Sequence, residues 1–124
     1  MTKKQRKELA QRSAQWWADL VRDPKHIDYC LGDRRKFVEQ KVYGIKDGRD
    51  DVFQCSLEEI IEGLLEKQGE ARLYVEYHPC GYLKKAFEEA GIKYPSLPNR
   101  AEMKISENGI AVKNFKKNAW RTLV

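Results

Sequence analysis

Histidine, cysteine and long apolar runs are all scarce in this chain of 124 residues. Its three cysteines, Cys30, Cys55 and Cys80, are an odd number and widely spread, which argues against a disulfide framework and favours reduced thiols in a cytoplasm. No stretch approaches the ~18 apolar residues that a membrane span needs. The basic N-terminal residues are not followed by the apolar segment of a signal peptide. We therefore expect a cytoplasmic protein that does not enter a membrane.

Sequence signatures of catalysis are absent as well. The chain holds no phosphate-binding P-loop, no glycine-rich dinucleotide fingerprint and no Gly-x-Ser-x-Gly motif. Only two histidines are available for general acid or base chemistry. We expect a binding protein that is not an enzyme and that uses no cofactor.

Charge is abundant but unevenly distributed along the chain. Charged residues are 35% of the total, and the net charge is +5. Residues 1–49 hold 13 basic and 7 acidic side chains, residues 50–93 hold 5 and 10, and residues 94–124 hold 6 and 2. A basic first part and a basic tail thus flank an acidic middle. Such asymmetry either steers an acidic partner to one face or lets the two halves neutralise each other.

The N-terminal segment has the pattern of an amphipathic helix. Apolar residues at helical spacing and a capping box that begins at Thr2 predict a helix over 3–22. Trp16 and Trp17 stand about 100° apart on this helix. One of the two rings should therefore lie in the core and the other at its edge.

Three further helices and a short strand are predicted in the next segment. Asp-Pro and glycine boundaries indicate helices over 24–31 and 33–44. A polar turn then leads to a short strand over 52–55. Ser56 followed by acidic residues is an N-cap pattern, so the apolar stripe behind it predicts a helix from Ser56 to Gly69.

Strands dominate the rest of the chain. Alternation predicts a strand over 72–77 with Leu73, Val75 and Tyr77 on one face, and Asn108-Gly109 is a strong hairpin signal. We predict an α+β fold in a single domain, residues 1–124, with a helical N-terminal half packed on a small three-stranded sheet with a C-terminal β-hairpin. The strands are 72–77, 102–106 and 110–114, and a helix over 82–90 follows the first.

The turn His78-Pro79-Cys80-Gly81 is the best candidate for chemistry. A thiol or a bound anion at the start of the following helix would lie near free backbone amides and the positive end of the helix dipole. A catalytic cysteine also needs a base and an orienting group, which this sequence barely provides. We therefore take His78, Cys80 and Gly81 as a candidate anion- or ligand-binding turn. A small buried Cys80 in a tight turn is the structural alternative.

Zinc-type donors occur without a zinc motif. His26 and Cys30 stand one helical turn apart, and His78, Cys80 and Cys55 add further donors. No Cys-x-x-Cys pair is present, and buried free cysteines are the commoner explanation. No metal site is predicted from these residues.

Three aspartates near residue 50 could in principle bind a divalent cation. Asp47, Asp50 and Asp51 surround Gly48, but the EF-hand loop pattern is absent. A solvated turn is the simpler interpretation.

Basic residues gather in three segments, and several lie beside aromatic residues such as Phe37 and Trp120. Phosphate contact combined with base stacking needs such neighbours, although both aromatics also suit a core and the charges a solvated face. A glycine turn before Arg34 also fits a helix-turn-helix. The candidate nucleic-acid-binding residues are Lys3, Lys4, Arg6, Lys7, Arg34, Arg35, Lys36, Lys41, Lys116, Lys117 and Arg121.

Taken together, these features favour a small binding or regulatory protein that engages nucleic acid or an acidic protein surface through a basic helical face. The chain also resembles small accessory proteins of phages and mobile elements, which implies a protein inhibitor or adaptor acting by protein–protein contact as one alternative. A small enzyme, or an anion or ligand binder centred on the His78–Cys80 turn, is the other.

Overall fold

The computed structural model describes residues 1–23, 44–93, 95, 97–98, 100–114 and 119–123. The predicted helices over 24–31 and 33–44 fall on residues 24–43, outside the described part of the chain, apart from Gly44. The elements are α1 (Lys3–Arg22), α3 (Arg49–Gln68), β1 (Glu70–Glu76), β2 (His78–Pro79), α4 (Gly81–Glu89), β3 (Arg100–Ser106), β4 (Gly109–Asn114) and β5 (Trp120–Thr122).

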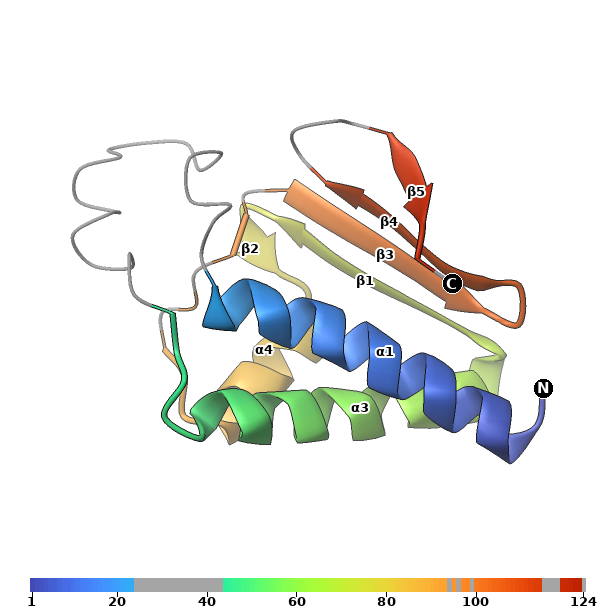
Figure 1. Cartoon of the computed structure of the whole chain (residues 1–124), viewed down its shortest axis with the longest axis horizontal. Helices are drawn as coiled ribbons and strands as arrows, with labels where there is room; N and C mark the ends of the chain where they lie inside the picture. Colours follow the sequence, from blue (N-terminus) through green and yellow to red (C-terminus); the bar gives the residue numbers. More distant parts are fainter. Residues whose placement is uncertain (24–43, 94, 96, 99, 115–118, 124) are drawn as a thin grey trace.

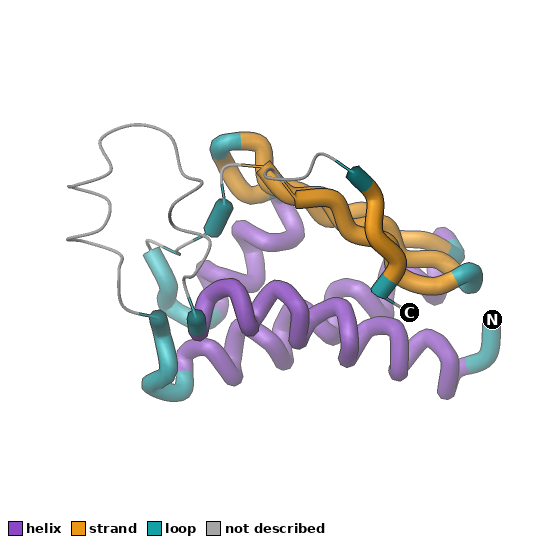
Figure 2. The backbone as a smooth tube through the Cα atoms, turned by 45° about the horizontal axis from the view of Figure 1, so that its top comes forward, coloured by secondary structure: helices purple, strands orange, loops and turns teal. Residues whose placement is uncertain are grey.

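The elements form two layers, with helices on one side and a sheet on the other (Figure 1). All strand pairs are antiparallel, and the strand order is β2-β1-β3-β4-β5. Helices α1 and α3 lie side by side in opposite directions beneath the sheet, as Figure 2 also shows. The predicted α+β class, helical N-terminal half and C-terminal hairpin are confirmed.

The sheet has more strands than the three predicted. All three of those are present as β1, β3 and β4, but two short strands extend the sheet at its edges. β2 has two residues, one of them proline, and β5 has three. Segments this short show no usable alternation, so their pairing follows from the neighbouring strand rather than from their own pattern.

Helix α1 confirms the predicted range and cap. The Thr2 hydroxyl accepts a hydrogen bond of 3.1 Å from the backbone N–H of Gln5. Trp17 is fully buried and Trp16 is partly buried, so one ring is core and the other is at its edge. The two rings meet edge to face with their centroids 4.9 Å apart, which is a favoured aromatic geometry.

Helix α3 begins earlier than predicted, and the predicted strand over 52–55 is wrong. The helix starts at Arg49, after Gly48 with a φ of +99° that favours glycine. Asp50 and Asp51 lie in the first turn, where carboxylates favour the positive end of the helix dipole. The buried stripe then runs at four-residue spacing through Phe53, Leu57, Ile61 and Leu65.

Ser56 is therefore not a helix cap. It lies inside α3, is buried, and its hydroxyl donates a hydrogen bond to the Glu89 carboxylate of α4. Phe53 stacks on Phe87 of α4 with ring centroids 4.3 Å apart and an interplanar angle of 7°. These contacts join α3 to α4, so the residues that mimic a cap in the sequence serve helix–helix packing.

The core lies between the helices and one face of the sheet. Its strand members alternate with exposed residues, as in β1, where Ala71, Leu73 and Val75 are buried. The hairpin predicted at Asn108-Gly109 is confirmed, with Ser106 paired to Gly109. Within the described residues, helices α1, α3 and α4 contact the sheet, and they cover one of its faces.

Candidate functional site

In the described part of the chain, the helices cover a single face of the sheet (Figure 2). An antiparallel sheet of this kind buries apolar residues on one side and presents polar ones on the other. We call the outward residues of the strands the open face. It consists of Glu70, Arg72, Tyr74, Glu76, Arg100, Glu102, Lys104, Ser106, Ala111, Lys113, Trp120 and Thr122.

One row of the open face crosses four strands and has an aromatic residue at each end. Tyr74 pairs with Glu102, Glu102 with Lys113, and Lys113 with Trp120. Adjacent strands lie about 4.8 Å apart, so three spacings separate the two aromatic residues by about 14 Å. The two rings therefore sit on one face, with charged residues between them.

Trp120 has two lysines over its ring. The Nζ atom of Lys104 lies 4.4 Å from the ring centroid and that of Lys113 lies 5.9 Å away. Trp120 is 42% exposed, so it does not occupy the core position that its sequence context also allowed. An exposed indole beside two ammonium groups can stack on a flat ring and place cations near its substituents.

Tyr74 is 38% exposed and has a fixed cation beside it. The guanidinium carbon of Arg72 lies 5.0 Å from the Tyr74 ring centroid, and Arg72 Nε donates a 2.8 Å hydrogen bond to Glu102 Oε2. This hydrogen bond holds the pKa of Glu102 below its ordinary value, against the opposing effect of partial burial. Lys104 and Lys113 attract the same carboxylate. Glu102 is thus ionised, and it holds Arg72 and attracts the two lysines around it.

Tyr77 lies at the tight connection between β1 and β2. Glu76 pairs with His78, so Tyr77 alone forms the turn, with a φ of +64° that is unusual for a residue other than glycine. Its ring is 49% exposed, and the Arg100 guanidinium carbon lies 5.3 Å from its centroid. The prediction that Tyr77 shares a strand face with Leu73 and Val75 is wrong because the strand ends at Glu76. Backbone strain that projects an aromatic ring into solvent is a feature of functional sites.

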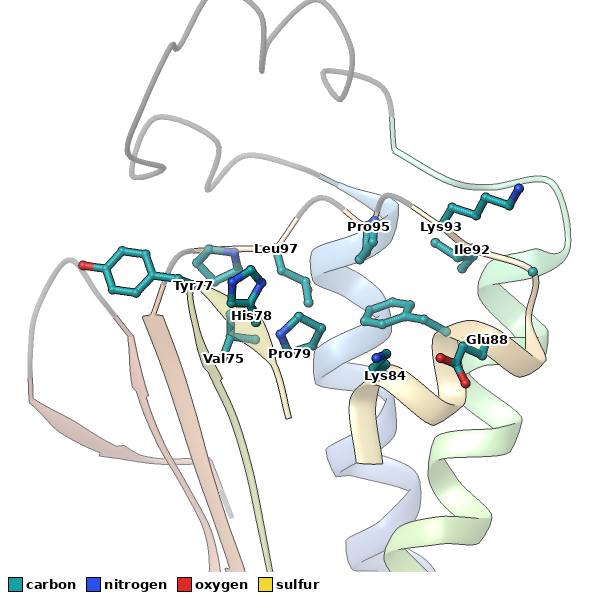
Figure 3. A pocket seen from close by; sticks show the side chains of 13 residues that line it. Val75, Tyr77, His78, Pro79, Lys84, Glu88, Ile92, Lys93, Pro95 and Leu97 are labelled. Atoms are coloured by element: carbon teal, nitrogen blue, oxygen red, sulfur yellow. The ribbon is translucent and has the colours of Figure 1, made fainter. Parts of the chain in front are cut away.

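The residues of the His78–Cys80 turn do not face the same site. His78 is exposed and lines a pocket (Figure 3), whereas Cys80 is buried at the N-cap of α4 and is not among the pocket's lining residues. The Cys80 N–H donates a 2.9 Å hydrogen bond to the Tyr74 carbonyl, which ties the turn back to β1. Gly81 is the first residue of α4 and is exposed. His78 and Cys80 therefore face different surroundings.

The two cysteines that the structure describes differ in exposure. Cys80 is 7% exposed, as the alternative of a buried cysteine in a tight turn requires, whereas Cys55 on α3 is exposed, so the interpretation as a buried free cysteine is wrong for Cys55. Cys30 and His26 lie outside the described residues. Among the residues that are described, no group of three or more histidine, cysteine, aspartate or glutamate side chains is placed to hold a metal ion.

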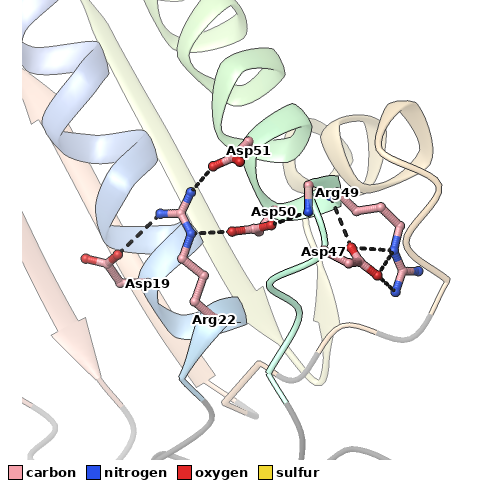
Figure 4. Close-up of polar contacts among 7 residues, drawn as sticks. Asp19, Arg22, Asp47, Arg49, Asp50 and Asp51 are labelled. Carbon is pink, nitrogen blue, oxygen red and sulfur yellow. Dashed lines mark hydrogen bonds and ion pairs between the residues drawn. The ribbon is translucent and has the colours of Figure 1, made fainter.

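The three aspartates near residue 50 accept hydrogen bonds from arginine side chains (Figure 4). Arg22 of α1 donates to Asp50 Oδ2 at 2.6 Å and to Asp51 Oδ1 at 2.9 Å. The bond from Arg22 holds the pKa of Asp50 below its ordinary value, with burial opposing it. Asp47 receives hydrogen bonds from Arg49, which lower the pKa of Asp47 in the same way. The cluster therefore joins α1 to the start of α3.

The predicted basic residues that the structure describes do not lie together on the open face. Lys3, Lys4 and Lys7 are exposed on the first turns of α1, in the helical layer. Arg6 is partly buried and donates to the Met1 carbonyl at 3.1 Å. Arg121 is exposed on β5 but pairs with buried Val112, so it points away from the open face. The remaining candidates, Arg34, Arg35, Lys36, Lys41, Lys116 and Lys117, lie outside the described residues.

The sequence did not predict the open face because the residues that form it belong to separate sequence segments. Tyr74 and Lys104 stand at outward positions of strands that alternation predicts, so their exposure was available from the sequence. Their juxtaposition depends on the pairing of Arg72 with Lys104, which joins strands separated by α4. Trp120 joins them only through the short strand β5.

Within the described part of the chain, no helix combines the length and the apolar character that crossing a membrane requires. Comparisons with models of protein families, with curated proteins and with solved structures found no match to this chain. Its function is therefore argued from the chemistry of the open face and its surroundings.

Proposed function

We propose that this protein binds single-stranded nucleic acid on the open face of its sheet. The observation that carries the proposal is a set of three exposed rings, Tyr74 and Trp120 on the open face and Tyr77 in the turn beside it, each with an arginine or lysine next to it. Aromatic platforms for stacking, combined with cations for phosphates, are the chemical requirements of this kind of binding.

A single strand suits the open face better than a duplex does. Bases stack on protein side chains only when they are not already stacked and paired within a helix. The rings of Tyr74 and Trp120 lie on a sheet surface rather than on a helix that could enter a groove. Stacking contributes about 1–3 kcal/mol per base, so two or three rings supply the main part of a micromolar affinity.

The cations of the open face give the interaction its salt dependence. Arg72, Arg100, Lys104 and Lys113 are the cations available for phosphates, and Glu102 holds Arg72 by a hydrogen bond and attracts the two lysines. Four phosphate contacts on a single strand correspond to a slope of about −3 in log affinity against log salt. The basic first turns of α1 add to long-range attraction but lie in the other layer.

The proposal is tested by the binding of fluorescent oligonucleotides, measured by anisotropy at low and moderate salt. Trp120→Ala and Tyr74→Ala should each weaken binding of a single-stranded oligonucleotide by about 5- to 100-fold. Lys113→Gln should lower affinity at low salt and reduce the salt slope by about 0.7. A duplex of the same sequence should bind more weakly than the single strand.

Tyr82→Ala is the matched control. Tyr82 is 40% exposed, close to the 38% of Tyr74, but it lies on α4 in the helical layer. Its removal should leave oligonucleotide affinity unchanged. If no oligonucleotide binds even at low salt, the proposal fails, and an acidic protein partner becomes the better hypothesis for the same cations. Equal losses for Tyr74→Ala and Tyr82→Ala would also exclude the open face as the contact.

A binding role without catalysis and a location in the cytoplasm belong to the same proposal. The exposed free thiol of Cys55 suits a reducing compartment such as the cytoplasm. Cys80, the thiol next to His78, is buried, which does not favour a nucleophilic role.

A further inference from the structure

A pocket of about 830 Å³ opens between the β1–β2 turn, α4 and the chain that follows α4 (Figure 3). Its volume falls in the range of small-molecule sites, about 300–1,000 Å³. Buried apolar side chains line it, among them Val75, Phe87 and Ile92. Its polar side chains are those of Tyr77, His78, Lys84, Glu88 and Lys93, so the site combines an apolar lining with a few polar groups, as small-molecule sites do.

Tyr77 adjoins both the pocket and the end of the sheet. It is among the lining residues of the pocket, and Arg100 lies beside its ring. Figure 3 shows the Tyr77 side chain extending away from the pocket interior, while the neighbouring His78 lies within the wall. A strand that extended from Trp120 past Tyr74 to Tyr77 would end at the turn that borders the pocket.

Charged groups on the pocket lining select the end of the ligand that they contact. Lys84, Lys93 and the His78 imidazole provide donors for an anion, and Glu88 is the carboxylate among the described lining residues. Lys84 and Glu88 are four residues apart on α4, so their side chains are neighbours on the helix surface. Lys93 comes after the helix, and in Figure 3 its side chain extends away from the pocket interior. Lys84 is therefore the lysine that a phosphate group in the pocket would contact.

We infer that this pocket holds one nucleotide of the strand bound on the open face, with its base against the apolar lining and its phosphate at Lys84. This inference rests on the proposed function. A base has flat apolar faces that suit the half-buried rings of Pro79 and Pro95, and splayed bases of single strands are the parts that proteins bind in pockets. The chemistry assigned to the pocket is therefore that of a nucleoside monophosphate.

The test is an NMR titration of the full-length protein with adenosine 5′-monophosphate, compared with inorganic phosphate and with adenosine alone. The nucleotide should shift the amide signals of His78, Phe87 and Ile92, and it should bind more tightly than either fragment. Lys84→Glu should weaken nucleotide binding by at least about fivefold because it removes a phosphate partner and adds a like charge. Lys85→Glu is the matched control, since Lys85 is exposed on α4 and does not line the pocket.

Failure of this inference differs from failure of the proposed function. Trp120→Ala should weaken oligonucleotide binding and leave binding of the mononucleotide in the pocket unchanged. If the mononucleotide shifts only Tyr74 and Trp120, or no residue at all, the pocket assignment is wrong while the open face remains supported by its own oligonucleotide data. If Lys84→Glu and Lys85→Glu bind the mononucleotide equally well, the assignment is also wrong. If the mononucleotide binds in the pocket but no oligonucleotide binds the protein, both the open face and the idea of a strand-linked pocket are overturned.

Discussion

Replacing Asp50 with asparagine tests how the end of α1 is held to the start of α3. The Asp50 side chain is 8% exposed and accepts hydrogen bonds from Arg22 Nε at 2.6 Å and from the Gly48 N–H at 3.1 Å. Asparagine keeps the shape but not the charge, and a hydrogen bond to a charged group contributes about 1.5–3 kcal/mol. Because the Arg22 side chain is 23% exposed, solvent weakens the interaction. We expect Asp50→Asn to lower the free energy of unfolding at pH 7 by about 2 kcal/mol.

The same carboxylate makes this loss depend on pH. The hydrogen bond from Arg22 lowers the pKa of Asp50 in the folded protein. The stabilisation is therefore complete above about pH 4, the ordinary range of an aspartate, and is lost as the pH falls through the lower folded pKa. Asp50→Asn has no such titration. The difference in stability between the two proteins should therefore shrink as the pH is lowered from 7 to 3.

Urea unfolding followed by tryptophan fluorescence at pH 7 and pH 3 measures both effects. Asp51→Asn is the control, since Asp51 also contacts Arg22 but its side chain is 78% exposed. An exposed ion pair of this kind contributes about 0–1 kcal/mol. Equal losses for Asp50→Asn and Asp51→Asn at pH 7 would refute the reasoning. A deficit for Asp50→Asn that is as large at pH 3 as at pH 7 would refute the assigned titration.

Three further predictions concern packing. Brief iodoacetamide treatment followed by peptide mapping should label Cys55 faster than Cys80, because Cys55 is exposed and Cys80 is 7% exposed; equal rates would contradict the placement of α3. Gly44→Ala should lower stability by more than ~1 kcal/mol, because a Cβ atom there would overlap the Arg22 carbonyl oxygen, and an unchanged melting temperature would contradict this close approach. Ser56→Ala should cost about 1 kcal/mol through the lost bond to Glu89 while circular dichroism keeps its helix signal; a shortened helix would instead support the N-cap.

The elements whose start or turn is set by neighbouring residues in the sequence were predicted correctly. The Thr2 capping box and the Asn108-Gly109 turn lie next to the residues whose conformation they set, and both α1 and the hairpin are confirmed. The start of α3 was predicted wrongly because Ser56 offers a good local cap. The true start depends on Arg22, which lies 28 residues before its partner Asp50 in the sequence. That contact, together with the stripe that begins at Phe53, overrides the local pattern.

The sequence predicted the kind of residues that form the candidate site, but not how they are arranged. Basic residues beside aromatic ones predicted contact with nucleic acid, and Trp120 was among the aromatics considered. Which cations surround Trp120 depends on the register between β3, β4 and β5, and this register joins residues far apart in the chain. The prediction that Tyr77 shares a face with Leu73 and Val75 failed because alternation carries no information about where a strand turns back.

The contact between α1 and β4 has a consequence for how the chain folds. The core combines Leu9 and Trp17 near the start with Ile110 and Val112 near the end, and Leu123 donates a 2.8 Å hydrogen bond to the Ile110 carbonyl. During synthesis, α1 can meet α3 early, but the apolar surface for β4 stays uncovered until almost all of the chain has left the ribosome. A nascent chain halted after β3 would therefore lack Ile110 and Val112 and expose the apolar surface that they cover, and at this stage aggregation and chaperone binding compete with folding.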